Sequence, residues 1–81
     1  MMKVMVKLYA TLRRFAPEGN EIGAAFEVEY QGATISELIQ HLRFTSEQSK
    51  IIMVNGQRVI DLNFILDEND LVVIFPPVGG G

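Results

Sequence analysis

The carboxyl end of this chain holds the one group whose position suggests chemistry. An apolar run, Leu71 to Phe75, is followed by Pro76, Pro77, Val78, Gly79, Gly80 and Gly81, with a terminal carboxylate. Proline keeps the backbone extended and glycine has no Cβ, so residues 76–81 form a stiff base and then a thin thread. At about 3.3 Å per residue this tail spans roughly 20 Å. A frayed terminus could also be rich in glycine, but it has no reason to follow Phe-Pro-Pro-Val.

Other reactive groups are sparse. There is no cysteine, which excludes a thiolate nucleophile, a disulfide and a cysteine-ligated zinc site. His41 is the only histidine, and because no nucleophile or ligand cluster is patterned around it, we expect a residue at the boundary of the core or on the surface. The acidic stretch Asp67 to Asp70 lacks the spacing of a calcium loop and predicts a solvated turn. We therefore expect no metal site, no permanently bound cofactor and no catalytic residues of the chain's own.

Length and composition fit one small domain. The chain has 81 residues, 48% of them hydrophobic, and a formal net charge of -3. We expect residues 1–75 to form the domain and residues 76–81 a flexible tail. The negative charge argues against nonspecific nucleic-acid binding. Lys3 and Lys7 interrupt the first apolar segment, and no run has transmembrane length, so we expect a cytoplasmic protein without a membrane segment.

Strand patterns dominate the chain. From Lys3 to Tyr9 apolar residues alternate with mixed ones, and Ala25 to Tyr30 alternates apolar residues with two glutamates, which predicts two strands with one buried face each. Arg13 and Arg14 should mark the exit from the first strand, and a loop should join the two strands over residues 15–20. Asn55-Gly56 lies between two β-type runs and predicts a tight type I′ hairpin.

One helix is expected. Thr34 and Glu37 have the spacing of a capping box, and the apolar residues that follow recur at helical spacing, at Ile35, Leu38, Ile39 and Leu42. The helix should therefore begin at Thr34 and fade near Phe44.

The predicted order is strand, strand, helix, strand, short strand, strand, with Phe64-Ile65-Leu66 as a short apolar anchor before the last strand. This order suggests an α+β domain with the β-grasp arrangement of ubiquitin-like proteins, in which a mixed sheet of about five strands packs on one main helix. The first and last strands should be central and parallel. Both faces of Leu71–Phe75 are apolar, and one helix covers only one sheet face, so the other face is a candidate protein-binding patch.

The chain resembles the MoaD/ThiS group of small sulfur-carrier proteins. The resemblance extends over nearly the whole chain, and the segments that carry it are Leu12-Arg13, residues 33–38, Val54-Asn55-Gly56 and residues 66–81. The end, Phe-Pro-Pro-Val followed by glycines, is most similar to the small subunit of molybdopterin synthase. The turn Glu68-Asn69-Asp70 replaces the usual Asp-Gly-Asp, and asparagine still tolerates left-handed geometry.

This resemblance implies that the chain carries sulfur and that its partner enzymes catalyse the reactions. An E1-like enzyme would use ATP to adenylate the carboxylate of Gly81, and a sulfur donor would convert it to a thiocarboxylate. The large subunit of molybdopterin synthase, or another sulfur-acceptor enzyme, would then receive the sulfur. The resemblance also implies that Tyr9, Phe75 and Arg13 contact partners.

Alternatives remain open at this point. Residues 42–54 form a short segment that is closer to thiamine-type carriers, and paralogous carriers serve other sulfur-requiring pathways. The same glycines suit a ubiquitin-like modifier joined to target lysines through Gly81. A plain interaction domain would bind through the sheet and need no terminal chemistry.

Overall fold

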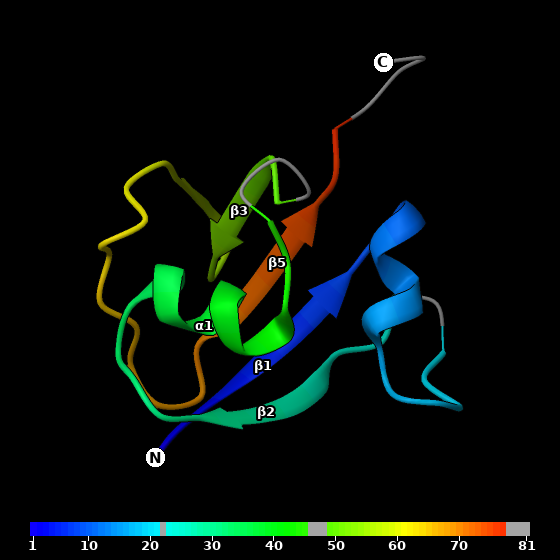
Figure 1. Ribbon diagram of the computed structural model, residues 1–81, viewed down its shortest axis with the longest axis horizontal. Coiled ribbons are helices and arrows are strands. Elements are labelled where there is room, and N and C mark those ends of the chain that lie inside the picture. Colours follow the sequence, from blue (N-terminus) through cyan, green and yellow to red (C-terminus); the bar gives the residue numbers. More distant parts are fainter. Residues whose placement is uncertain (22, 46–48, 78–81) are drawn as a thin grey trace.

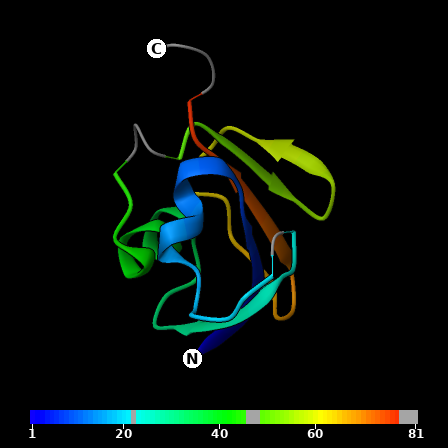
Figure 2. The same cartoon turned by 90° about the vertical axis from the view of Figure 1, so that its right-hand side faces the viewer.

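A computed structural model describes residues 1–21, 23–45 and 49–77 (Figure 1). Five strands, one α-helix and one 3-10 helix follow in the order β1 Met2–Leu8, η1 Ala10–Phe15, β2 Phe26–Tyr30, α1 Ile35–Leu42, β3 Ile51–Val54, β4 Gln57–Val59 and β5 Leu71–Phe75. The strands form one mixed sheet, and α1 lies across one of its faces (Figures 1 and 2). The predicted α+β class and its mixed sheet on one helix are confirmed.

The first and last strands occupy the middle of the sheet. The strand order is β2-β1-β5-β3-β4, with β1 and β5 parallel and every other neighbouring pair antiparallel. Parallel neighbours need a crossover connection. The part of the chain between β1 and β5 supplies this connection. Because β5 lies between β1 and β3, the strand that precedes the tail is hydrogen-bonded on both sides.

The core lies between α1 and the sheet. Alternate residues of the strands point toward the helix, and so does the apolar stripe of α1. The fully buried side chains are Val4, Val6, Leu8, Leu12, Tyr30, Ile35, Leu38, Leu66, Val72 and Ile74. The predicted inward faces of β1, β2 and α1 are therefore confirmed.

The helix begins as its capping box predicts. Thr34 Oγ1 accepts a hydrogen bond from the Glu37 amide at 3.2 Å, and Glu37 Oε1 accepts one from the Thr34 amide at 3.0 Å. The same oxygen also accepts from the Ala33 amide at 2.9 Å. These bonds stabilise the ionised carboxylate and hold the pKa of Glu37 below its usual value. The last residue of the helix is Leu42, and Arg43 caps it with a left-handed φ of 68°.

Two turns also follow the prediction. Asn55 and Gly56 have φ values of 51° and 85°, the positive pair that a type I′ hairpin requires. Asn69 has a φ of 68°, so asparagine does adopt left-handed geometry in the turn before β5. The carboxylate of Asp70 closes that turn and links it to the hairpin, since its Oδ2 accepts from the Asp67 amide at 2.8 Å and its Oδ1 from Asn55 Nδ2 at 2.8 Å.

The segment after β1 differs from the prediction. Residues 10–15 form the 3-10 helix η1 rather than a simple exit from the strand, and Leu12 is buried while Phe15 is half-buried. Residues three apart share one face in a 3-10 helix. The apolar residues Leu12 and Phe15, three positions apart, were therefore the feature of the sequence that could have indicated the 3-10 helix.

The predicted anchor before β5 is only partly correct. Leu66 is 1% exposed, but Phe64 is 39% exposed and Ile65 67% exposed. Ile65 makes a single bridge with Thr34 instead of a strand, and Leu66 donates its amide to the carbonyl of Ala33. Backbone pairing with the helix entrance fixes this segment, so only one of its three apolar side chains needs the core.

Within the described residues, no helix is long and apolar enough to cross a membrane.

Candidate functional site: the open sheet face and the start of the tail

One face of the sheet is left uncovered by α1 (Figure 2). We call it the open face and define it by the outward residues of the strands together with the aromatic residue that follows β1. Its apolar members are half-buried, namely Met5, Tyr9, Ile51, Met53, Leu71, Val73 and Phe75. The sequence indicated that β1 and β5 contribute apolar residues to this face. The contribution of β3 was not predicted, although residues 51–54 are apolar on both sides of the strand.

The open face changes from charged to apolar toward the tail. In the strand register, Lys3 lies opposite Glu29, and Met5 lies between Glu27 and Leu71. Further along, Val73 lies between Lys7 and Met53, and Arg58 lies opposite Met53. At the end of the sheet Phe75 lies opposite Ile51. The fully apolar row is thus the one beside the tail.

An aromatic pair completes that row. The rings of Tyr9 and Phe75 stack with centroids 4.9 Å apart and an interplanar angle of 12°. Tyr9 is held by its place at the start of η1, where its carbonyl accepts from the Leu12 amide at 3.1 Å. Two of the residues predicted to bind partners are therefore brought together on the surface next to the tail.

The tail starts from a fixed point. The Lys50 amide donates to the carbonyl of Phe75 at 3.0 Å, so hydrogen bonding continues to the last residue of β5. Pro76 is buried and Pro77 is exposed, and the division between a domain of residues 1–75 and a tail of residues 76–81 stays a prediction. Val78, Gly79, Gly80 and Gly81 lie outside the described residues.

Arg13 has an intramolecular role. Its guanidinium is half-buried and donates to Asn20 Oδ1 at 2.7 Å and to the Asn20 carbonyl at 2.6 Å. These two bonds join η1 to the loop that leads toward β2. The contact of Arg13 with a partner stays a prediction.

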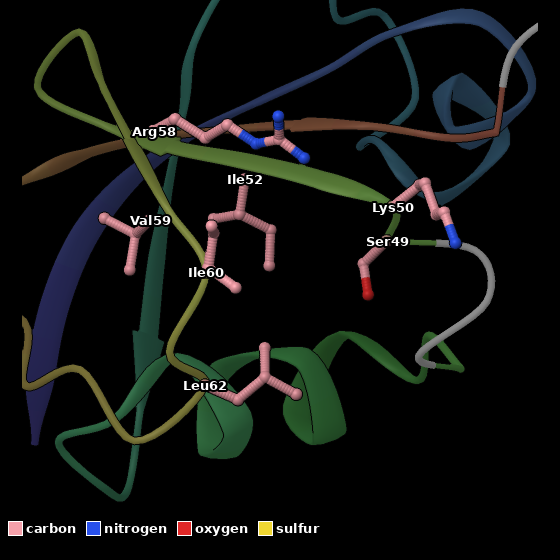
Figure 3. A pocket seen from close by; sticks show the side chains of 7 residues that line it. All are labelled: Ser49, Lys50, Ile52, Arg58, Val59, Ile60 and Leu62. Atoms are coloured by element: carbon pink, nitrogen blue, oxygen red, sulfur yellow. The ribbon is translucent and has the colours of Figure 1, made fainter.

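A cavity of about 300 Å³ lies on the other side of β3 and β4 (Figure 3). The apolar side chains that border it include Ile52, Ile60 and Leu62, and Lys50 and Arg58 contribute cationic side chains. Among the described residues that line it, the hydroxyl of Ser49 donates to the Thr45 carbonyl at 3.1 Å.

Acidic and histidine side chains do not gather into a metal site in the part of the chain that the structure describes. His41 is exposed at the end of α1, as predicted, and its ring lies 6.2 Å from that of Tyr30. Burial raises the pKa of Tyr30, with smaller contributions from the carboxylates of Glu37 and Asp70. Tyr30 donates its hydroxyl to the Thr34 carbonyl at 3.3 Å, so it supports the start of the helix.

The comparison with protein families covers both the sheet and the tail. The model of the ThiS family matches residues 6–81. The chain belongs to the ThiS family. This confirms the resemblance to the MoaD/ThiS group that was inferred from the tail, the helix start and the hairpin.

Solved structures agree with this assignment of a ThiS-family protein. A Pyrococcus furiosus protein assigned as molybdopterin converting factor subunit 1 is 29% identical, with a TM-score of 0.68, and the match covers 96% of this chain and all of that one (100%). In the complex of subunits 1 and 2 of molybdopterin-converting factor from Helicobacter pylori, the matched chain is 22% identical with a TM-score of 0.61, over 99% and 100% of the two chains. A search of curated proteins gave no match.

A third neighbour comes from a different functional class. Small archaeal modifier protein 1 of Haloferax volcanii is 21% identical with a TM-score of 0.66, and 96% of this chain and 100% of that one are covered. The solved structures confirm the β-grasp fold predicted for this ThiS-family protein. The family match and the 29% identical neighbour support the coarser assignment to the sulfur-carrier, ubiquitin-like type.

Proposed function

We propose that this ThiS-family protein carries sulfur as a thiocarboxylate on Gly81 and donates it in molybdopterin biosynthesis. The carboxylate would be adenylated by an E1-like enzyme at the expense of ATP. A sulfur donor would then replace AMP, and a sulfur-acceptor enzyme, such as the large subunit of molybdopterin synthase, would receive the charged tail. The chain itself holds no cofactor in this cycle.

The observation that carries the proposal is the apolar row beside the start of the tail. Tyr9, Phe75 and Ile51 form a surface without charge at the end of the sheet where Pro76 begins the tail. Aromatic residues in the centre of an interface carry a large share of binding energy. A partner that covers this row lies next to the emerging tail and can receive it.

The chemistry explains why the partners must act in sequence. A carboxylate is a poor electrophile because its oxygen is a poor leaving group. Attack of the carboxylate oxygen on the α-phosphorus of ATP forms an acyl-adenylate and releases pyrophosphate. Attack of hydrosulfide, supplied by the sulfur donor, on the acyl carbon then expels AMP and, after loss of a proton, leaves the thiocarboxylate, whose sulfur is the nucleophile for transfer.

Two further observations support the molybdopterin assignment over other sulfur pathways. The Phe-Pro-Pro-Val segment precedes the glycines. The Pyrococcus furiosus neighbour, which is assigned as a molybdopterin converting factor subunit, matches at 29% identity over nearly the full length of both chains. The fold is also that of an archaeal modifier, so conjugation to target lysines is the second candidate function.

The test is the intact mass of the protein after incubation with the cognate E1-like enzyme, ATP and a sulfur donor. The affinity tag is placed at the amino terminus so that Gly81 stays free. We expect a species in which one oxygen is replaced by sulfur and which disappears when the thiocarboxylate is alkylated. Deletion of Gly81 should abolish it, whereas replacement of the exposed Ile65 by alanine should leave it unchanged.

The acceptor step is tested separately. The thiocarboxylate form is mixed with the large subunit and the pterin precursor, and sulfur incorporation is followed by mass. Charging without transfer would assign the protein to another sulfur pathway. Larger isopeptide-linked species without a thiocarboxylate would establish the modifier function, and an unmodified mass under all conditions would refute activation at Gly81.

A further inference from the structure

The outer edge of β2 is an open sheet edge. Strand β2 ends the sheet order, and among residues 1–21, 23–45 and 49–77 no strand pairs with its other side (Figure 1). The hydrogen bonds of β1 show which backbone groups of β2 are free. The carbonyl of Lys3 accepts from Asn69 and the amide of Met5 donates to Asp70, so both residues direct their backbone groups toward β5.

The alternate residues of β1 must therefore bond to β2. In an antiparallel pair the residues that exchange hydrogen bonds alternate with those that do not. Val4 lies opposite Val28 and Val6 opposite Phe26, and these are the bonded pairs. The amides and carbonyls of Glu27 and Glu29 consequently point away from the sheet, which is the arrangement that an added strand requires.

A groove runs along this edge on the side of α1. It has a volume of about 370 Å³, and all four residues from Phe26 to Glu29 line it together with the end of the helix. Its apolar lining includes Phe15, Phe26 and Leu42, each half-buried. The ring of Phe15 packs edge-on against that of Phe44 at 4.6 Å, which fixes one wall. Apolar side chains of an added strand would enter here.

The two sides of the edge differ in charge. On the open face Glu27 and Glu29 are both exposed, and Lys3 is the cation nearest to them in the register. The ammonium of Lys3 lies 3.9 Å from the Glu27 carboxylate, whereas Glu29 forms no ion pair with any of the described residues. On the groove side the exposed Arg43 lies in the rim. A basic side chain is thus favoured opposite the glutamates and disfavoured in the groove.

We propose that the outer edge of β2 binds an extended segment of a partner protein in which apolar residues alternate with lysine or arginine. The segment adds to the sheet as an antiparallel strand, with its apolar side chains in the groove and its basic side chains opposite Glu27 and Glu29. A second copy of this chain does not fit, because pairing β2 with β2 would set these glutamates against each other. This edge is separated from β5 by β1, and its backbone groups and groove do not include the tail, so the proposal does not rest on the chemistry proposed at Gly81.

The test uses the peptide acetyl-Lys-Val-Lys-Val-Lys-amide and the full-length protein. We expect saturable binding, observed by NMR at β2 and the end of α1, with new protection of the Glu27 and Glu29 amide hydrogens from exchange. The charge-reversed peptide with glutamate in place of lysine should not bind. Glu29→Lys should weaken binding roughly fivefold. The control Asp67→Lys makes the same change of charge in an exposed turn and should leave the affinity nearly unchanged.

Methylated peptides test the backbone contact. In the antiparallel register the lysine nitrogens donate to β2, whereas the valine nitrogens point away. N-methylation of the lysines should abolish binding and N-methylation of the valines should not. Binding that survives methylation of the lysines, or that weakens equally in Glu29→Lys and Asp67→Lys, would overturn the proposal. So would concentration-dependent self-association through β2 in place of peptide binding.

Discussion

Phe75→Ala should separate partner recognition from folding. The Phe75 ring lies on the open face and stacks on Tyr9 at 4.9 Å. Loss of such a pair costs the free protein about 0.5–1.5 kcal/mol beyond the lost burial, which leaves a domain with a core of this kind folded. At the centre of an interface the same truncation costs about 2 kcal/mol or more. Since 1.4 kcal/mol corresponds to tenfold, kcat/KM for activation should fall roughly 30-fold.

The assay is pyrophosphate release by the cognate E1-like enzyme at varied carrier concentration. Unfolding in urea is measured in parallel, so that the activation data refer to folded protein. Phe64→Ala is the matched control, because it makes the same truncation at a ring that is 39% exposed in the segment between β4 and β5. Its kcat/KM should stay within about twofold of the wild type, as expected for a surface substitution outside the interface.

Two results would refute this reasoning. Folded Phe75→Ala that is activated as efficiently as the wild type would show that the row beside the tail is not the docking surface. An equal loss in Phe64→Ala would place recognition on the segment between β4 and β5.

Three further predictions concern the scaffold. Thr34→Ala removes the acceptor of the Glu37 amide and should lower the free energy of unfolding by about 0.5–2 kcal/mol, measured from urea midpoints. Because the pKa of Glu37 is lower in the folded state, the stability that its carboxylate contributes is fully present above the usual glutamate pKa and is lost as pH falls through the lower folded value. Glu37→Gln should therefore make the free energy of unfolding depend less on pH in that window. An unchanged dependence at acidic pH would contradict the role of the capping box. Leu66→Ala should cost about 2–5 kcal/mol because its side chain is 1% exposed, whereas Ile65→Ala, at 67% exposed, should stay within about 0.5 kcal/mol, and similar thermal midpoints for the two would show that the segment is not anchored as described.

Local patterns made the fold predictable to a large extent. The capping residues Thr34 and Glu37 fixed the start of α1, and Asn55-Gly56 fixed the hairpin because few residues accept two positive φ angles. Alternation along β1 showed which side chains are buried. The parallel central pair followed from the order of elements and from the doubly apolar last strand.

The errors arose where tertiary contacts override local pattern. Residues 10–15 include two arginines that favoured the end of a strand, but burial of Leu12 against the sheet favours the 3-10 helix η1. Phe64 and Ile65 look like core residues, yet backbone bonds near the helix entrance hold the segment without them. The contact of Arg13 with Asn20 depends on the fold of the loop, so it could not be predicted from the spacing of the two residues.

The central place of β5 also has a mechanical consequence. The tail continues from a strand that is paired with β1 on one side and β3 on the other. Tension applied to the tail along the strand direction would load both ladders in shear, so many hydrogen bonds would share the force rather than break one after another. Withdrawal of the tail from a narrow channel in a partner would therefore disturb the domain little. In contrast, a tail attached to edge strand β4 could peel that strand away bond by bond.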